Sequence, residues 1–266
     1  SGGSAANTAV GFKSFGGTCS FIGQIGNDKF GDLFSKDLNN SGIFYKSKNF
    51  QSTDKTSKSI ILVTPDAERS MNTFLGASIR FNINSFDEKF IINSSMIYIE
   101  GYLFDQPEAK EAIYYCCNLA KSQNKKVALS LSDLFCVDRH RIDFLNLIEN
   151  YVNIIFANEH EIKSLYQSDL IQSINTIKNN VDFGAITLGS KGSIVFENKA
   201  EHIIDPIFIE ELVDTTGAGD LFAAGFLYGF INKHSIEKCG HLGNKAASEI
   251  IKHIGARPKI SLKAIL

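Results

Sequence analysis

Apolar positions in the middle of this chain form short continuous runs that alternate with stretches of helical spacing. Short apolar runs separated by helices are typical of a parallel sheet covered by helices, so an α/β fold is predicted. The predicted strands are residues 96–100, 126–131, 152–157 and 183–188. The predicted helices are residues 107–122, residues 138–149 and a third that begins after Asn158.

Both ends of the chain carry further elements with the same kinds of pattern. The first part predicts a helix at 4–15, a strand at 19–25 and a helix starting at 26–28. In that second helix the apolar positions on one face are Phe30, Leu33, Phe34 and Leu38. The last part predicts a hairpin from 192–197 and 200–205, an apolar helix from 221, and a final helix at 235–254 that ends at Gly255.

Residues 59–64 and 69–75 flank a turn at 65–68 and predict another β-hairpin. This hairpin interrupts the alternation of strands and helices, so we expect a small sheet outside the main one. Two interpretations of the insertion, at about 44–80, are open on the sequence. It is either a lid over a site or a hairpin without a function.

Polar chemistry, a glycine turn and an apolar helix meet at residues 214–220, Asp-Thr-Thr-Gly-Ala-Gly-Asp. The run 221–230 is apolar on nearly every face, which indicates a buried helix. Its first turn points unpaired N–H groups at one spot, and such a spot attracts an anion such as a phosphate. Asp220 would then be placed to take a proton from a hydroxyl group. Alternatively, Asp220 caps the helix and the glycines only form a turn.

Composition narrows the function classes. The chain has 266 residues, 44% of them hydrophobic, which suits one sizeable domain over 1–266. A net charge of −2 without a basic stripe argues against nucleic acid, and no apolar run reaches the length of a membrane span. Five cysteines without Cys-x-x-Cys indicate reduced thiols in a cytoplasmic protein.

Three smaller constellations have both a structural and a functional interpretation. Asn158 and Glu161 form either a capping box or a carboxylate that holds the hydration shell of Mg²⁺, and both can hold at once. Residues 187–192, Thr-Leu-Gly-Ser-Lys-Gly, suit a nucleotide phosphate or a hairpin turn, and they lack the P-loop spacing. Residues 2–7 suit hydrogen bonds to vicinal hydroxyls, or a turn and a cap.

Taken together, these motifs resemble the ribokinase-like (PfkB) family of sugar and nucleoside kinases, in the family's order and over essentially the whole chain. The matching motifs are Gly2-Gly3-x-x-x-Asn7-x-Ala9 through Gly23-x-Ile25-Gly26-x-Asp28-x-x-Gly31, Asn158-x-x-Glu161, and Asp214-Thr-x-Gly-Ala-Gly-Asp220 followed by Phe222 and Gly225-Phe226. Within the family, residues 98–102, 129–135 and 240–248 look most like the adenosine kinase branch. The resemblance implies a three-layer αβα sandwich with a mostly parallel central sheet and a small β lid.

The resemblance also implies a role for each matched position in an ATP-dependent kinase. Asp220 would be the general base, and the N–H groups of Gly217, Ala218 and Gly219 would form an anion hole for the transferred phosphoryl group. Gly3 and Asn7 would hold substrate hydroxyls, and Asn158 and Glu161 would organise Mg²⁺ and phosphates. The nucleotide would be bordered by Thr187, Gly189, Gly192, Asn244 and Ala247. Many family members respond to K⁺, and lids of the family sometimes pair between subunits, so a monomer or a homodimer is implied.

The N-terminal end of the given sequence departs from the family pattern. Family members carry a few tens of residues before the paired glycines, including the first strand of the sheet, a substrate-binding Asp and part of the lid, whereas this sequence begins at Ser1. We therefore expect a piece that is incomplete at its N-terminus and impaired in substrate binding.

Three functions are compared on the sequence. The leading one is a kinase that phosphorylates the CH₂OH group of an adenosine-like nucleoside. A sugar kinase for ribose, fructose or 2-keto-3-deoxygluconate is the alternative within enzymes. A non-catalytic nucleotide- or sugar-binding protein is the third, and the intact Asp220 beside Gly217-Ala218-Gly219 argues against it.

Overall fold

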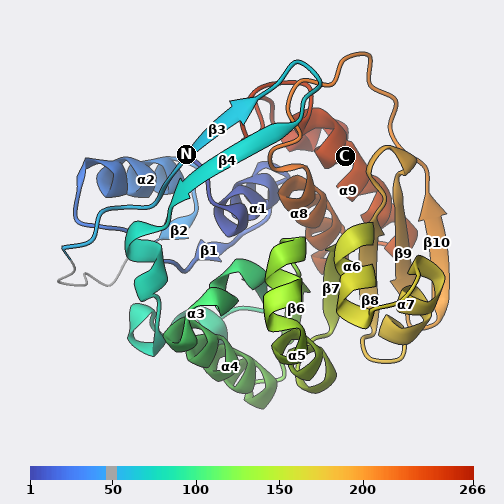
Figure 1. Ribbon diagram of the computed structural model, residues 1–266, viewed down its shortest axis with the longest axis horizontal. Helices are drawn as coiled ribbons and strands as arrows, with labels where there is room; N and C mark the ends of the chain where they lie inside the picture. Colours follow the sequence, from blue (N-terminus) through green and yellow to red (C-terminus); the bar gives the residue numbers. More distant parts are fainter. Residues whose placement is uncertain (46–52) are drawn as a thin grey trace. The chain divides into compact units, whose positions relative to one another are not determined.

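The structure, a computed structural model, describes residues 1–45 and 53–266 and divides the chain into two compact units. Unit 1 comprises Ser1–Phe86 and Ile207–Leu266, and unit 2 comprises Asp87–Pro206. Each unit is described by itself (Figure 1). No helix of the described residues is long and apolar enough to cross a membrane.

Unit 2 is built on a six-stranded sheet with the order β10-β9-β8-β7-β6-β5. Its strands are β5 (Met96–Glu100), β6 (Lys126–Ser130), β7 (Ile154–Asn158), β8 (Phe183–Thr187), β9 (Ser193–Glu197) and β10 (Ala200–Ile204). The first four are parallel, and β9 and β10 add to them as an antiparallel hairpin. The predicted α/β fold with a mostly parallel sheet and a terminal hairpin is confirmed.

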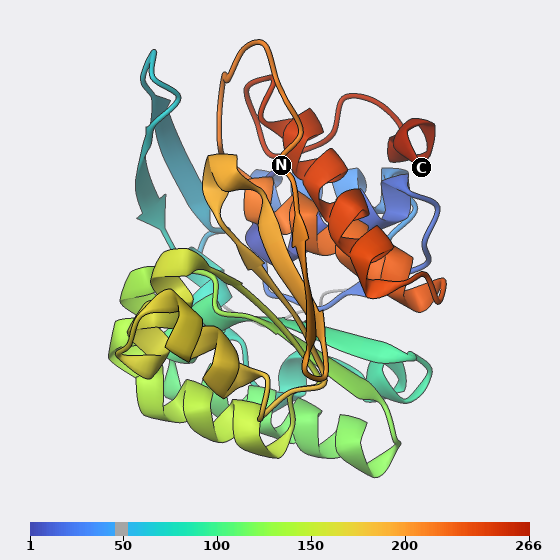
Figure 2. The same ribbon diagram turned by 90° about the vertical axis from the view of Figure 1, so that its right-hand side faces the viewer.

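The helices of unit 2 gather along one face of this sheet, as Figure 2 shows. They are α3 (Lys89–Ile92), α4 (Pro107–Ser122), α5 (Leu134–Asn150), α6 (Glu159–Tyr166) and α7 (Leu170–Ile177). The helix predicted at 138–149 begins earlier, because the Asp133 carboxylate accepts hydrogen bonds from the N–H groups of Phe135 and Cys136. Helix α7 was not predicted; Asp169 caps it in the same way.

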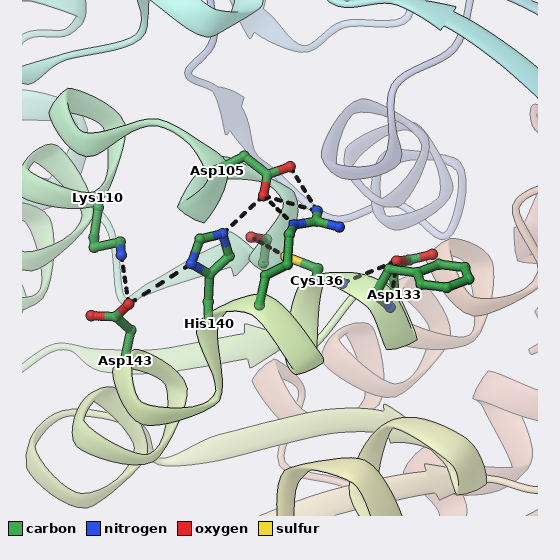
Figure 3. Close-up of polar contacts among 9 residues, drawn as sticks. Asp105, Lys110, Asp133, Cys136, His140 and Asp143 are labelled. Atoms are coloured by element: carbon green, nitrogen blue, oxygen red, sulfur yellow. Dashed lines mark hydrogen bonds and ion pairs between the residues drawn. The ribbon is translucent and has the colours of Figure 1, made fainter.

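An ion network ties α5 to the elements beside it and accompanies a kink at His140, whose backbone is non-helical (Figure 3). The guanidinium of Arg139 donates to both carboxylate oxygens of Asp105, which ends the short 3-10 helix Gly101–Asp105, and His140 Nε2 lies 2.8 Å from the same carboxylate. Lys110 of α4 pairs with Asp143 of α5 at 2.5 Å. These contacts are structural, because they join three neighbouring elements through charges that neutralise one another.

Unit 1 is organised around α8 (Ala218–Ile231), which packs against both α1 (Ser4–Ser14) and α9 (Ile236–Ile250). The predicted burial of α8 is confirmed, since Leu221 and Phe226 are fully buried. Gly225 allows the close approach of α9, because a Cβ atom there would lie 2.4 Å from the carbonyl oxygen of Leu242. The final helix is shorter than predicted and ends at Ile250, before the loop that carries Gly255.

The N-terminal part of unit 1 departs from its predicted pattern. The strand expected at 19–25 is only β1 (Ser20–Phe21), paired in parallel with β2 (Phe44–Tyr45). The residues after Phe21 form a loop, in which Gly26 N–H donates to Thr56 Oγ1. Helix α2 (Lys29–Asn40) begins after Asp28, as predicted, but Phe30 and Leu33 of its apolar face are half exposed.

The predicted β-hairpin is a separate two-stranded sheet, β3 (Lys58–Val63) and β4 (Arg69–Phe74), with Ala67 in the left-handed region at its turn. The other short helices of unit 1 are Gly76–Arg80, Ile83–Ser85 and Leu262–Ile265. Part of the insertion expected at 44–80, residues 46–52, lies outside the described residues.

Candidate functional site

The first turn of α8 contains two glycines with different reasons to be glycine. Gly217 is the N-cap residue with φ 86°, and a Cβ atom on it would lie 2.8 Å from Ala256 Cβ, so the fold itself requires a glycine. A Cβ atom on Gly219 would meet no described atom within 4 Å. Protein packing therefore does not explain Gly219, and the space beside it is open to a ligand.

The N–H groups at this helix start are only partly used. Ala218 N–H donates to the Thr215 carbonyl at 3.2 Å, whereas those of Gly217 and Gly219 have no acceptor among the described residues. Of the three N–H groups expected to bind an anion, two are thus available and one is already engaged. Two free donors at the positive end of a buried helix remain suited to an anion.

Asp220 lies in this first turn and does not cap α8, so the capping interpretation is wrong. Its carboxylate instead accepts hydrogen bonds from side chains of α1, near the N-terminal end of the sequence. Ser4 Oγ donates to Oδ1 at 2.7 Å and Asn7 Nδ2 donates to Oδ2 at 2.8 Å. One donor on each oxygen fixes the orientation of the carboxylate and leaves lone pairs for a further donor.

Burial raises the pKa of Asp220, and the hydrogen bonds from Ser4 and Asn7 oppose that rise. The positive charges of Arg69 and Arg257 oppose it as well. Arg69 reaches this region from β4, where its Nη1 donates to Thr215 Oγ1 at 2.6 Å. Asp220 is thus a partly buried carboxylate held among donors and cations, which suits a group that accepts a proton.

Asp214 is a structural residue of the same loop. Its carboxylate accepts hydrogen bonds from the N–H groups of Thr216 at 2.9 Å and Gly255 at 3.0 Å. Burial acts to raise the pKa of Asp214, but these hydrogen bonds outweigh it and hold the pKa below its usual range. The bond to Gly255 and the packing of Ala256 on Gly217 attach the loop after α9 to the start of α8.

A second acidic centre lies in unit 2, where β7 passes into α6. Asn158 and Glu161 form the predicted capping box: Asn158 Oδ1 accepts from Glu161 N–H at 2.9 Å, and Glu161 Oε2 accepts from Asn158 N–H at 2.9 Å. Asn158 Nδ2 also donates to Glu161 Oε1 at 2.6 Å. The structural interpretation of this motif is confirmed, and its carboxylate is fixed in one orientation.

Burial raises the pKa of Glu161 to about 7, and the negative charges of Asp133 and Glu100 add to the rise, against the hydrogen bond from Asn158 N–H. Glu100 ends β5 and its Oε2 accepts from Ser132 Oγ at 2.7 Å. Because β5, β6 and β7 are parallel, their carboxyl ends bring these acidic residues to one edge of the sheet.

This arrangement fits Mg²⁺. Carboxylate oxygens in fixed orientations are the ligands that a hard cation takes, directly or through its water molecules. Burial, and to a smaller extent the carboxylates of Asp133 and Glu100, raise the pKa of Glu161, and a divalent ion beside it would favour its ionised form. No set of three His, Cys, Asp or Glu side chains in the described residues could enclose an ion, so phosphate or water would complete its coordination.

The remaining residues expected at a nucleotide site fall in both units. Thr187 ends β8, and Gly189 and Gly192 have positive φ in the tight turn before β9, so the hairpin-turn interpretation is confirmed. Gly192 is required there, because a Cβ atom would lie 2.1 Å from the Ile204 carbonyl oxygen. In unit 1, Asn244 and Ala247 lie on α9, where Asn244 is buried. Gly3 is the N-cap residue of α1.

Residues 1–263 match the family model described as pfkB family carbohydrate kinase. The chain belongs to this family. It is therefore an ATP-dependent kinase of small molecules such as sugars and nucleosides, and kinases of the family generally use Mg²⁺ with ATP.

Solved structures and curated relatives agree with this assignment. A probable sugar kinase from Rhizobium etli is 41% identical with a TM-score of 0.96, and the match covers 99% of this chain and 81% of that one. An adenosine kinase from Sinorhizobium meliloti is 39% identical with the same TM-score and coverages. A 5-dehydro-2-deoxygluconokinase from Geobacillus kaustophilus is 26% identical over 94% of this chain and 78% of its own. The ribokinase-like fold is confirmed.

Sequence reasoning did not find several polar residues of these two centres. Ser4, Arg69 and Arg257 contact or act on Asp220 from segments far away along the chain. Glu100 and Asp133 act on Glu161. A signal existed for the last two, because Glu100 ends one predicted strand and Asp133 follows another, and the carboxyl ends of these strands meet at one edge of a parallel sheet. Around Asp220, Ser4 lies in the stretch 2–7, one of the three smaller constellations of the sequence, whereas Arg69 and Arg257 had no comparable signal.

Proposed function

We propose that this pfkB family kinase transfers the γ-phosphoryl group of ATP to the CH₂OH group of an adenosine-like nucleoside, with Asp220 as general base. The observation that carries the proposal is the partly buried Asp220 carboxylate, oriented by Ser4 and Asn7 at the open start of α8. Phosphoryl transfer needs positioning and charge neutralisation more than covalent chemistry by the protein, and this arrangement offers both.

In the proposed reaction, Asp220 accepts the hydroxyl proton as the substrate oxygen attacks the γ-phosphorus and the bond to the β,γ-bridging oxygen breaks. The hydrogen bonds from Ser4 to Oδ1 and from Asn7 to Oδ2 hold the carboxylate in a fixed orientation, and a remaining lone pair takes the proton. The N–H groups of Gly217 and Gly219 stabilise charge on the transferred group. Ala218 contributes the geometry of the turn, since its own N–H is engaged.

Substrate hydroxyls are proposed to bind at the start of α1. Asn7 Oδ1 is buried and accepts no hydrogen bond among the described residues, although Asn7 Nδ2 is committed to Asp220. A buried acceptor without a donor is unfavourable, and a substrate hydroxyl would satisfy it. Gly3, at the N-cap of the same helix, is proposed to approach the substrate through its backbone.

Unit 2 is proposed to supply the groups that act on the metal and on part of the nucleotide. Glu161 and Asn158 would hold Mg²⁺ through its water shell, and the ion would neutralise phosphate charge. Thr187, Gly189 and Gly192 would border the nucleotide, and Asn244 and Ala247 of α9 in unit 1 would lie beside its base. The dependence on K⁺ that the family resemblance implies stays a prediction, which a KCl titration of the rate tests.

The β3–β4 hairpin is proposed to be a lid. Its support is the hydrogen bond from Arg69 to Thr215, which links the hairpin to the loop before α8. The hairpin otherwise stands largely in solvent, with Ile60, Leu62 and Phe74 more than half exposed, so it has few contacts to restrain its motion.

The substrate class has two candidates. An adenosine-like nucleoside is favoured by the 39% identity to an adenosine kinase over 99% of this chain. A sugar is favoured by the 41% identity to a probable sugar kinase over 99% of this chain, and a sugar acid by the weaker likeness, at 26% identity, to a 5-dehydro-2-deoxygluconokinase. Identity alone does not separate the two classes, and the nucleoside is the first choice because residues 98–102, 129–135 and 240–248 look most like the adenosine kinase branch.

A substrate panel tests the proposal. The full-length protein is mixed with Mg-ATP and, separately, adenosine, ribose, fructose or 2-keto-3-deoxygluconate, and ADP release is followed. We expect release with adenosine alone. Turnover of a sugar instead would overturn the substrate choice but keep the reaction, whereas an Asp220→Asn variant with wild-type turnover would remove Asp220 from the role of base.

A further inference from the structure

Arg257 is a mostly buried cation that the proposed reaction does not yet use. It follows α9, and its side chain is only 18% exposed. The Nε and Nη2 atoms are buried and make no hydrogen bond among the described residues, although Nη2 lies 3.7 Å from Asp37 Oδ2 on α2. Burying a guanidinium with unused donors is unfavourable, so a compensating interaction is needed to explain its position.

Two carboxylates compensate its charge: Asp37 has the larger effect on the pKa of Arg257, and Asp220, in the first turn of α8, has the smaller. Arg257 and Asp220 attract one another: the carboxylate favours the charged guanidinium, and the guanidinium favours the charged carboxylate. Two fixed contacts bring Arg257 toward this turn. Asp214 binds Gly255 N–H, and Ala256 packs on Gly217, so the residue next in sequence is carried to the first turn of α8.

We propose that Arg257 is a positioning residue of the kinase reaction, which holds the Asp220 carboxylate in its ionised, proton-accepting form before the substrate arrives. The proposal rests on the proposed role of Asp220 as general base. An opposite charge beside a buried carboxylate stabilises its ionised form, and burial strengthens that effect because water screens less. Asp37 shares the guanidinium and so limits its effect on Asp220.

The charged groups that act on Asp220 come from two elements of unit 1. Arg69 reaches it from β4 and Arg257 from the loop after α9, while the uncharged Ser4 and Asn7 donate from α1. Asp37 of α2 faces Arg257. Arg69 also interacts with Asp214 and is tied to Thr215, on the hairpin that we propose to move. Arg257 is thus the cation attached to the site by the fold itself.

The test is the pH dependence of kcat/KM for the nucleoside at saturating Mg-ATP, compared between wild type, Arg257→Met and Arg257→Lys. A base must be ionised to act, so the rate falls as pH falls through the pKa of Asp220. Without the guanidinium that pKa rises, and the acidic limb should move to higher pH by about one unit or more. Arg257→Lys keeps a positive charge and should bring the limb back toward its wild-type position. The titration of Mg-ATP is common to all variants and cancels in the comparison.

Asp37→Asn is the matched variant, because it keeps Arg257 and removes its second carboxylate. Its acidic limb should move to lower pH, and this result decides the proposal even if Arg257→Met does not fold. A limb that stays at the wild-type pH in Arg257→Met, or that moves upward in Asp37→Asn, would overturn the proposal. Loss of thermal stability with an unmoved limb would show that Arg257 only anchors the loop. Wild-type turnover by Asp220→Asn would instead contradict the proposed function itself.

Discussion

Asp220 in unit 1 is partly buried and Glu161 in unit 2 is buried, and the pKa of each carboxyl is raised, yet the charged groups around them have opposite signs. The positive charges of Arg69 and Arg257 act on Asp220, whereas the negative charges of Asp133 and Glu100 act on Glu161. A carboxylate beside cations can stay ionised in a dry site and take a proton from a neutral hydroxyl. A carboxylate beside other carboxylates accumulates negative charge and attracts a metal ion.

The two centres also differ in how their carboxylates are held. Glu161 is bound by backbone and side chain of Asn158, three residues away, so its position is set locally by the start of α6. Asp220 is bound by Ser4 and Asn7, whose sequence separations from it are 216 and 213. The centre proposed to accept the proton therefore depends on the packing of α1 against α8, and the centre proposed to bind the metal depends on one helix cap.

The largest effect is expected from Asp220→Asn, which keeps the shape of the side chain and removes the base. We predict that kcat falls by roughly 10²–10⁴ while ATP binding stays nearly unchanged. Steady-state kinetics and calorimetric ATP titration measure the two quantities. Asp32→Asn, at an exposed carboxylate in the first turn of α2, is the matched control and should keep wild-type kcat.

The pH dependence of stability should reveal Glu161 directly. Its pKa is about 7 in the folded protein and 4.5 in an unperturbed chain, so between these values the folded state holds a proton that the unfolded state has released. The free energy of unfolding therefore falls as pH rises through this window, by roughly 3 kcal/mol for the full shift. Denaturant unfolding at pH 5 and pH 8 measures the fall.

Glu161→Gln should remove that part of the fall, and Glu108→Gln, at an exposed glutamate in the first turn of α4, should keep it. An equal pH dependence in wild type and Glu161→Gln would show that burial does not raise the pKa of Glu161. Mg²⁺ with ATP should reduce the fall in wild type, since a bound cation stabilises the ionised carboxylate.

Metal dependence should separate the two centres further. In Glu161→Gln the Mg²⁺ concentration that gives half of the maximal rate should rise by about 10–100-fold, because a group that orients the ion's ligands is lost. Titration of Mg²⁺ at fixed ATP measures it. An unchanged Mg²⁺ requirement would mean that Glu161 serves only as the third residue of the capping box.

The smallest effect is expected from the two glycines of α8. Gly219→Ala should keep stability, since open space surrounds the added methyl group, and should lower kcat/KM for ATP by up to about tenfold through contact with the phosphate. Gly217→Ala should instead lower the melting temperature, because its φ is 86° and Ala256 occupies the space. Wild-type ATP kinetics in Gly219→Ala would remove the phosphate from that spot.

Local patterns were enough to predict most of the fold. The strands β5 to β8 appear in the sequence as apolar runs, and β9–β10 and β3–β4 as hairpins, because each is specified by its own residues and turns. The strand predicted at 19–25 was too long, since the chain after Phe21 is a loop in which Gly26 N–H donates to Thr56 Oγ1 and not to a neighbouring strand. Helix α7 was missed although Asp169 caps it and Ile174 and Ile177 are buried.

The candidate site was predictable where a motif carries it. The stretch 214–220 and Asn158-x-x-Glu161 mark both acidic centres, and the capping box follows from residue spacing alone. The charges that distinguish the centres were not predictable, because Arg69 and Arg257 reach Asp220 through tertiary packing. The sequence motifs identify the two candidate carboxylates. The sign of the charges around each carboxylate depends on segments that only folding brings together.

The most direct test of the difference between the two centres is a Mg²⁺ titration of the initial rate in three proteins: wild type, Asp220→Asn and Glu161→Gln. We predict that high Mg²⁺ restores much of the rate of Glu161→Gln, since a weakened metal site fills at higher concentration, and leaves Asp220→Asn slow at every concentration. Recovery of Asp220→Asn by Mg²⁺, or the same response in both variants, would contradict the assignment of the proton to Asp220 and of the metal to Glu161.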